Sequence, residues 1–214
     1  MQEQPKYNRA RNPKRAAYDM AQVNAILDAG LVGHVGFVAD GRPMVMPMAY
    51  ARGEGCVYIH GASKARIVKL GQGVALSMTV TLLDGIVAAR SAFHHSVNYR
   101  CAVVHGLGRA VTDPAEFDHA LQAITEHLLP GRYAEIRPVT AQERKATGLI
   151  ALEIEAASVK TRQGPPVDDA EDLALGLWAG VIPVTTALGR GVADHHCPDP
   201  AEPPSVALAR ARFA

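Results

Sequence analysis

The fold is decided in residues 57–70, which read Val-Tyr-Ile-His-Gly-Ala-Ser-Lys-Ala-Arg-Ile-Val-Lys-Leu. The stretch predicts a buried strand, a tight loop and a short helix. Its β-branched and aromatic opening suits a pleated, half-buried strand. Gly61 lets the backbone turn or lets another group approach closely. Ser63 stands where a helix N-cap would stand, ahead of apolar residues at helical spacing.

Lys64 and Arg66 fall in the first turn of this expected helix, the wrong end for cations if the helix dipole alone mattered. A negatively charged phosphate bound at this end of the helix would instead make the two cations favourable there. Free N–H groups, the Ser63 hydroxyl and two cations together make a phosphate seat. An ordinary capped surface helix is the alternative for a motif this short.

The composition indicates a globular protein without a strong electrostatic field. The chain has 214 residues and a net charge of +1, which offers nothing to attract nucleic acid or a membrane surface. No apolar run is long enough for a membrane span, and the polar N-terminus does not resemble a secretory signal. Three widely spaced cysteines, Cys56, Cys101 and Cys197, favour a reducing cytoplasm over a disulfide framework.

Short apolar runs with close turn signals continue outward from this stretch. They predict a mainly β (α+β) protein built on an antiparallel barrel, not a doubly wound sheet. Asp19 and Asp113 are expected to cap two amphipathic helices, at residues 19–30 and 114–129. Pro47 indicates a bulge or an edge in its strand. The expected strands are residues 32–39, 44–50, 56–60, 74–82, 86–89, 101–107 and 149–155, with turns at 40–43 and 84–85.

Composition also divides the chain into three parts. Residues 1–15 form a basic arm, which can bind nucleic acid or pack on a partner subunit, although a solvated tail is the usual interpretation of such a segment. Residues 16–162 hold the barrel. A Gly-Pro-Pro break follows Gln163, and residues 163–214 form an extension expected to pack on the barrel or on a partner subunit.

Common catalytic motifs are absent from the sequence: there is no nucleophile elbow, P-loop or Rossmann fingerprint in the required context. His94-His95 and the Asp-His-His-Cys-Pro-Asp run at 194–199 contain metal-ligating residue types. Adjacent strand residues point to opposite faces, so we assign neither pair as a metal site.

His60 follows a strand and precedes the phosphate seat. A core histidine with a satisfied hydrogen bond is the usual interpretation. Beside a phosphorylated ligand, its imidazole could instead stack on or bond to a heteroaromatic ring. Ser77 and Thr79 alternate with apolar residues on the next strand, where they leave room for such a ring or face solvent.

These residues, in this order, resemble the pyridoxamine 5′-phosphate oxidase-related flavin-binding split-barrel family, and most closely its nitroimidazole-reductase-like branch. The resemblance spans roughly residues 15–160. It rests on Pro47, the Tyr-Ile-His-Gly-Ala-Ser-Lys run at 58–64, residues 77–80, and the Ser-x-Phe-His-x-Ser-x-Asn-Tyr-Arg pattern at 91–100.

The resemblance implies a six-stranded Greek-key split barrel that works as a homodimer with FMN, or FAD, at the subunit interface. Residues 96–100 would then come from the other subunit. His60 and Arg100 become the catalytic candidates, delivering a proton and stabilising reduced flavin. The implied cofactor-binding residues are Pro47, Ile59, His60, Gly61, Ser63, Lys64, Arg66, Ser77, Thr79, Ser96, Tyr99 and Arg100.

The implied activity is FMN-dependent reduction of a small, nitroaromatic-like electrophile, with a reduced nicotinamide as electron donor. A flavin carrier or sensor is the main alternative. A haem-handling barrel, with His94, His95 or His105 as axial ligand, is another. Vitamin B6 oxidation fits poorly, because pyridoxamine-phosphate oxidases carry Arg and Lys where residues 44–50 offer methionines. Their C-terminal Arg/His motif is also not recognisable at residues 161–166.

Overall fold

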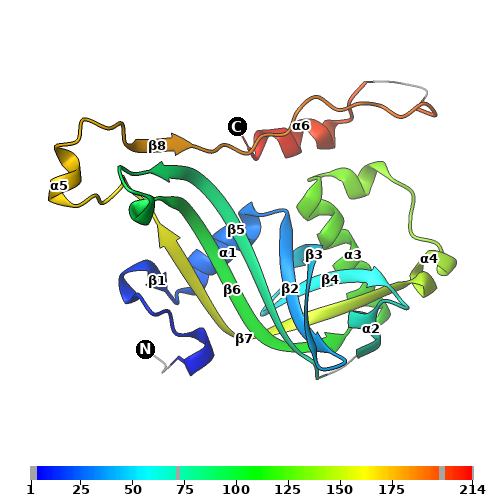
Figure 1. The fold of residues 1–214 in the computed structure, drawn as a ribbon. Helices are drawn as coiled ribbons and strands as arrows, with labels where there is room; N and C mark the ends of the chain where they lie inside the picture. The colour runs from blue at the N-terminus through cyan, green and yellow to red at the C-terminus, as the bar shows by residue number, and fades with distance from the viewer. Residues whose placement is uncertain (1–3, 71–72, 198–200, 214) are drawn as a thin grey trace.

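The computed structural model describes residues 4–70, 73–197 and 201–213, which form a partly closed antiparallel barrel (Figure 1). Six strands enclose it in the order β7-β4-β3-β2-β5-β6, and β6 pairs back onto β7. The order confirms the predicted Greek-key split barrel, because β5 returns beside β2 after the β2–β3–β4 meander. The barrel strands are β2 (Val32–Ala39), β3 (Arg42–Arg52), β4 (Cys56–Ala62), β5 (Ala75–Ala88), β6 (Ser96–Ala110) and β7 (Thr147–Arg162).

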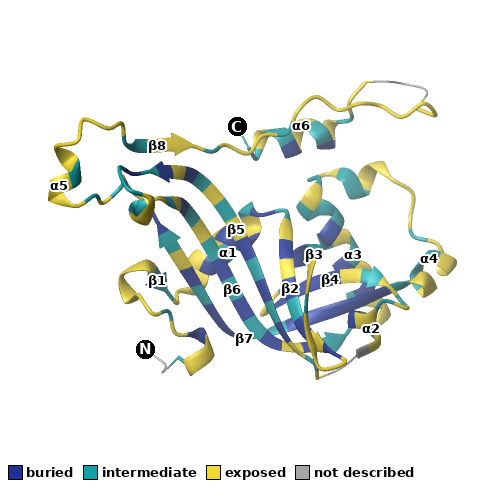
Figure 2. Cartoon of the chain, viewed as in Figure 1, coloured by how far each residue is buried: buried dark blue, intermediate teal, exposed yellow. Residues whose placement is uncertain are grey.

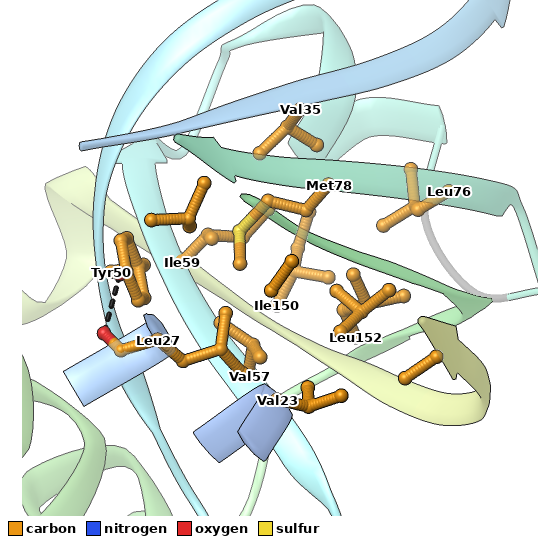
Figure 3. Close-up of a cluster of buried hydrophobic side chains, with 14 of the residues drawn as sticks. Val23, Leu27, Val35, Tyr50, Val57, Ile59, Leu76, Met78, Ile150 and Leu152 are labelled. Atoms are coloured by element: carbon orange, nitrogen blue, oxygen red, sulfur yellow. Dashed lines mark hydrogen bonds between the residues drawn. The ribbon is translucent and has the colours of Figure 1, made fainter. Parts of the chain in front are cut away.

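Alternation along these strands separates an inner face from an outer one (Figure 2). Val35, Met78 and Val104 are fully buried inside the barrel, where they meet buried side chains from β4 and β7 (Figure 3). Helix α1 (Met20–Ala29) covers one end of this core with Val23 and Leu27. The expected caps of α1 form: Asp19 accepts from the Gln22 N–H, and the Gly30 N–H bonds back to the Ile26 carbonyl.

A second apolar cluster lies between the outer surface of the barrel and α3 (Pro114–Leu128). Asp113 caps α3 as predicted, accepting from the Glu116 N–H. Phe117 and Ile124 of α3 pack over Cys56 and Tyr58 of β4. Helix α3 thus covers the outer surface of β4 and the end of β3. The outer face of β2, β5, β6 and the first part of β3 lies away from α3. The remaining helices are α2 (Arg66–Leu70), α4 (Ala141–Ala146), α5 (Ala170–Leu173) and α6 (Pro204–Ala211), with single turns η1 (Lys6–Asn8), η2 (Pro13–Arg15), η3 (Ala92–His94) and η4 (Arg132–Glu135).

The described part of the N-terminal arm packs on the barrel, so it is not the solvated tail that is usual for such a segment. Strand β1 (Ala16–Ala17) pairs with β7, and the buried Asn8 side chain donates to the Ala157 carbonyl at 2.9 Å. A buried amide needs such a partner, and β7 provides it.

The C-terminal extension runs back along the barrel and meets two of its elements. Strand β8 (Gly180–Pro183) pairs with the far end of β5 (Figure 1). Ser205 at the start of α6 is fully buried and donates to a Glu135 carboxylate oxygen at 2.6 Å. Among the described residues, no helix has the length and hydropathy needed to cross a membrane.

Two expected boundaries differ from the structure. The Asp84-Gly85 pair is a bulge inside the long strand β5, not a turn between two strands. Helix α2 begins at Arg66, so Ser63 does not cap it; the Ser63 N–H instead donates to the Ala146 carbonyl at 2.8 Å. The expected glycine stop after α2 falls partly on residues 71–72, outside the described residues.

Candidate functional site

The outer face brings four of the sequence candidates onto one surface. Cross-strand partners lie on the same face of a sheet. His34 of β2 is opposite Pro47 on one side and Thr79 on the other. The next row places Ser77 opposite Gly36 and His105. Pro47 keeps the β2–β3 register unbroken, because the β3–β4 ladder covers only residues 50–52 and leaves Pro47 on an edge.

His105 on β6 contributes a half-buried imidazole to this surface. The Tyr7 ring of the N-terminal arm contacts it edge-on, with ring centroids 5.1 Å apart. Partial burial lowers the pKa of His105. The ring is therefore held in its neutral form near pH 7, against an aromatic neighbour.

Arg100 lies where β6 passes beyond the barrel. Its guanidinium donates two hydrogen bonds to the Asp84 carboxylate, from Nη2 to Oδ1 at 2.8 Å and from Nε to Oδ2 at 3.0 Å. The hydrogen bond with Asp84 raises the pKa of Arg100. Both residues line an open cavity of about 750 Å³, together with His34, Thr81 and the chain end at Arg212. The Arg100 charge is thus already balanced within its own chain.

His60 ends the buried part of β4 and points to the outer side of the barrel. Its imidazole keeps an accessible face and has no hydrogen-bond partner among the described residues. Neighbouring protein atoms lower the pKa of His60 by partial desolvation. Desolvation therefore favours the neutral form of His60, and His60 is not a hydrogen-bonded core histidine.

The expected phosphate seat follows directly after His60. Lys64 is exposed and has no ion-pair partner within the described chain. Arg66 is exposed too and makes only a long contact, 3.9 Å, with Asp40. Two accessible cations remain close together, although α2 has five residues and no Ser63 cap. The seat consists of a turn and two flexible side chains, without a helix N-terminus behind them.

Two neighbouring candidates, Ile59 and Gly61, lie in regular strand. Ile59 is fully buried in the core, so its side chain faces away from any surface ligand. A Cβ added to Gly61 would meet Ala65 Cβ at 3.7 Å, an ordinary contact. Gly61 is thus not required for a close backbone approach within this chain.

The remaining candidates lie far from the phosphate seat. Ser96 is opposite Val87 and Tyr99 is opposite Leu83, at the end of β6 that extends past the barrel. From Arg100 to Ala110, where β6 reaches the level of β4, the strand runs ten residues, about 33 Å. One chain therefore separates residues 96–100 from residues 60–66.

Sequence reasoning missed His34 and Arg162. The alternation of β2 could have placed His34 on the outer face, since its neighbours Gly33 and Val35 are buried. Arg162 is buried at the end of β7, and no local pattern marks it. No group of three His, Cys, Asp or Glu side chains within the described residues is arranged to hold a metal ion.

Comparison with known proteins identifies the family to which this chain belongs. A family model described as pyridoxamine 5′-phosphate oxidase matches residues 19–161. The flavocytochrome Anf3 from Azotobacter vinelandii is 36% identical over 95% of this chain and 96% of its own, with a TM-score of 0.88. The FAD and heme binding protein from Mycobacterium smegmatis is 34% identical over 92% and 97%, with a TM-score of 0.85.

A more distant structure shares the fold alone. It is a proposed 5-nitroimidazole antibiotic resistance protein from Bacteroides thetaiotaomicron, 16% identical over 68% of this chain and 85% of its own, with a TM-score of 0.57. No curated protein sequence matches the chain. The family model covers two thirds of the sequence and two relatives match nearly all of it, so the chain belongs to the pyridoxamine 5′-phosphate oxidase family of split-barrel proteins.

Proposed function

We propose that this protein is a flavocytochrome: an electron-transfer protein that binds FAD and heme. One observation carries the proposal. The likeness to a flavocytochrome covers 95% of this chain, and so includes most of the extension beyond the residues that the family model matches. The likeness to an FAD and heme binding protein has nearly the same extent. The more distant nitroimidazole-resistance structure covers only 68% of the chain.

The residues of the phosphate seat fit a flavin nucleotide. Lys64 and Arg66 are accessible cations on one turn, and a phosphate oxygen takes charge-assisted hydrogen bonds from such groups. Beside them, the outer face offers small hydroxyl side chains at Ser77 and Thr79 between apolar strands. FAD is preferred over FMN because the Mycobacterium smegmatis relative binds FAD.

The chain also offers an imidazole suited to heme iron. Neutral imidazole with a free nitrogen is the ligating form. His94 lies 3.2 Å from the Asp169 carboxylate, and the Tyr7 ring covers part of His105. His95 has one ring nitrogen 2.8 Å from the Ser91 carbonyl. A heme-ligating imidazole normally donates its second ring N–H to a carboxylate or carbonyl oxygen, so the contacts of His94 and His95 leave both of them as candidates. His60 is accessible and has no partner at either ring nitrogen among the described residues, and we propose it as the residue that would hold the iron.

A homodimer completes the proposed site. Residues 96–100 lie about 33 Å along β6 from the level of the phosphate seat. This distance along the strand favours a site in which these residues meet the flavin of a second subunit. The outer face also exposes large apolar side chains, including Val32, Val38, Val45 and Leu83. Exposed apolar patches of this kind mark association surfaces.

A flavin and a heme, when bound, would link a two-electron donor such as a reduced nicotinamide to a one-electron acceptor. This chain's residues would hold and orient those groups. Lys64 and Arg66 would neutralise phosphate charge, His60 would hold the iron, and Arg100, paired with Asp84, would lie near the partner's site. A small electrophile such as a nitroaromatic compound is a proposed terminal acceptor.

The absorbance spectrum of the purified protein tests this proposal. We expect flavin bands together with a Soret band, and release of FAD on denaturation. His60→Ala should remove the Soret band and retain the flavin bands. Lys64→Ala should weaken flavin binding by about 1.5–3 kcal/mol, the value of a charge-assisted hydrogen bond. Lys69→Ala, an exposed cation on α2, serves as the matched control.

A colourless protein that cannot be reconstituted with FAD or heme would disprove the proposal. Retention of the Soret band in the His60→Ala protein would remove His60 from the axial position. Anaerobic addition of NADH or NADPH should bleach the flavin, and a nitro compound or dioxygen should restore it. Bound flavin that neither nucleotide bleaches would favour the carrier or sensor alternative.

A further inference from the structure

A second pocket lies away from the phosphate seat, between the N-terminal arm and the end of β7. Its volume is about 480 Å³. Lys14 and Arg15 line it from the arm, Gln22 from α1, and Arg162 and Gln163 from the end of β7. No acidic side chain lines it. Three cations therefore converge on one hollow without a carboxylate to balance them.

Arg162 is the unusual member of this group, because only 8% of it is exposed. Its Nη1 donates to the Asn98 side-chain oxygen and to the Gly164 carbonyl, and its Nη2 donates to the Pro165 carbonyl at 3.2 Å. A guanidinium carries five N–H groups. Three hydrogen bonds leave two of those five N–H groups without an acceptor among the described residues.

The Arg162 Nε has no partner among the described residues and is not sealed from solvent, so an anion in the pocket can reach it. Buried charges in proteins are normally paired, because neutral carbonyl groups replace hydration only in part. Arg162 has no carboxylate partner in the described chain. The planar guanidinium matches two oxygens of a phosphate group, and a second and third cation nearby suit a multiply charged anion.

The pocket is also held in place by backbone structure. Ala16 is opposite Lys160 and Ala17 is opposite Val159 in the β1–β7 ladder. This pairing fixes the chain directly after Arg15 against the strand that carries Arg162. The cations are therefore brought together by the fold before any ligand arrives, which reduces the entropy cost of binding.

We propose that this pocket binds the phosphate or pyrophosphate group of a nucleotide through Arg162, Arg15 and Lys14. The site rests on these residues alone and does not depend on the proposed heme or flavin function. A separate nucleotide and the flavin dinucleotide offer identical phosphate chemistry. If the flavin's phosphates occupy this pocket, they do not occupy the seat at Lys64 and Arg66, so the experiment below separates the two assignments. Arg162 is opposite Tyr99, so the pocket adjoins the segment expected to meet flavin.

Calorimetric titration of the purified protein with inorganic pyrophosphate, and then with inorganic phosphate, tests the site. We expect saturable binding, tighter for pyrophosphate. Arg162→Gln should raise the dissociation constant roughly tenfold or more, as for the loss of a charged hydrogen-bond donor. Lys14→Gln/Arg15→Gln should weaken binding in the same direction. This second variant changes no buried group, so it remains informative if Arg162→Gln fails to fold.

Lys145→Gln removes an exposed cation on α4 and should leave binding unchanged. Repeating the titration after saturation with FAD shows which molecule supplies the phosphate group that the pocket binds. Loss of pyrophosphate binding assigns the pocket to the flavin's own phosphates, and retained binding assigns it to a separate nucleotide. Absence of saturable binding to both anions, or equal affinity in the wild-type and Lys14→Gln/Arg15→Gln proteins, would overturn the proposal.

Discussion

Tyr50 shows how one side chain joins the barrel to the helix that covers its end. It is fully buried, and its hydroxyl donates its one proton to the Leu27 carbonyl at 2.5 Å (Figure 3), with the Gly30 carbonyl oxygen 3.2 Å away. The Leu27 carbonyl belongs to the last turn of α1, where carbonyls lack partners within the helix. Burial raises the pKa of Tyr50, so the hydroxyl remains a donor across the whole working pH range.

Tyr50→Phe should therefore destabilise the protein without changing the fold. The substitution keeps the ring but leaves the Leu27 carbonyl without this donor, at a cost of roughly 1–3 kcal/mol. Urea unfolding at pH 7 measures the difference. Tyr7→Phe, at an exposed tyrosine, is the control and should cost far less. Equal midpoints for the wild-type and Tyr50→Phe proteins would show that water replaces the hydroxyl at no cost.

The same scale shows which residues the sequence alone could assign. Asp19 and Asp113 cap their helices as predicted, because capping depends on a side chain and on N–H groups two or three residues away. Ser63 has the same local signal but does not cap. Its N–H finds the carbonyl of Ala146, more than eighty residues further along the chain, and no local pattern reports that partner.

Among the helices and strands too, local sequence fails to predict structure that depends on distant residues. Asp84-Gly85 has the composition of a turn, yet β5 continues through it as a bulge. Strands β6 and β8 supply partners on both sides. Gly85 is needed there because an added Cβ would lie 3.0 Å from Val181 Cγ1 and 3.1 Å from the Ile182 carbonyl oxygen. The missing side chain at Gly85 therefore makes room for β8, whose residues follow almost a hundred positions later in the chain.

Helix α3 is joined to the barrel by a small charged network. Arg109 of β6 donates to Glu116 of α3 at 2.7 and 2.9 Å and to Glu153 of β7 at 2.7 Å. The Tyr58 hydroxyl of β4 adds a fourth bond, to Glu116 at 3.1 Å. Arg109 first, and then Tyr58, lower the pKa of Glu116 below its ordinary value.

This network makes part of the stability depend on pH. A carboxyl whose pKa is lower in the folded state stabilises the protein above its unfolded pKa of about 4.3, and that contribution is lost as pH falls through the folded pKa. Glu116→Gln should cost about 0.5–1 kcal/mol at pH 7, since the pair is partly exposed. The cost should shrink at pH 3. Unfolding of both proteins at the two pH values measures it, and an equal cost at both would contradict the electrostatic origin.

At the scale of the molecule, the sequence predicts the barrel far better than the site. Hydrophobic alternation is a local signal, and the buried row Leu76, Met78 and Val80 follows it as predicted. A site assembled from distant segments has no such signal. His60 and Arg100 come from two strands, and Arg100 lies ten residues along β6 from the level of β4. Only the resemblance to a family connected these two residues, and it did not include His34.

The proposed homodimer gives the whole-molecule prediction. Val45 is 65% exposed on the outer face, in the same row as Ser77 and His105. If a second copy of the chain covers this exposed valine, the burial of its apolar surface stabilises the dimer. Val45→Asp would bury a charge at that contact, which association tolerates poorly.

We expect the wild-type protein to be a dimer by light scattering after size-exclusion chromatography, and Val45→Asp to be monomeric. Because the proposed flavin site needs residues 96–100 of the other subunit, the Val45→Asp protein should also lose flavin while its circular dichroism stays native. Val192→Asp introduces the same charge at a 95% exposed valine of the extension and should change neither property. A Val45→Asp protein that remains dimeric would place the interface elsewhere, and a monomer that still retains flavin would show that one chain completes the site.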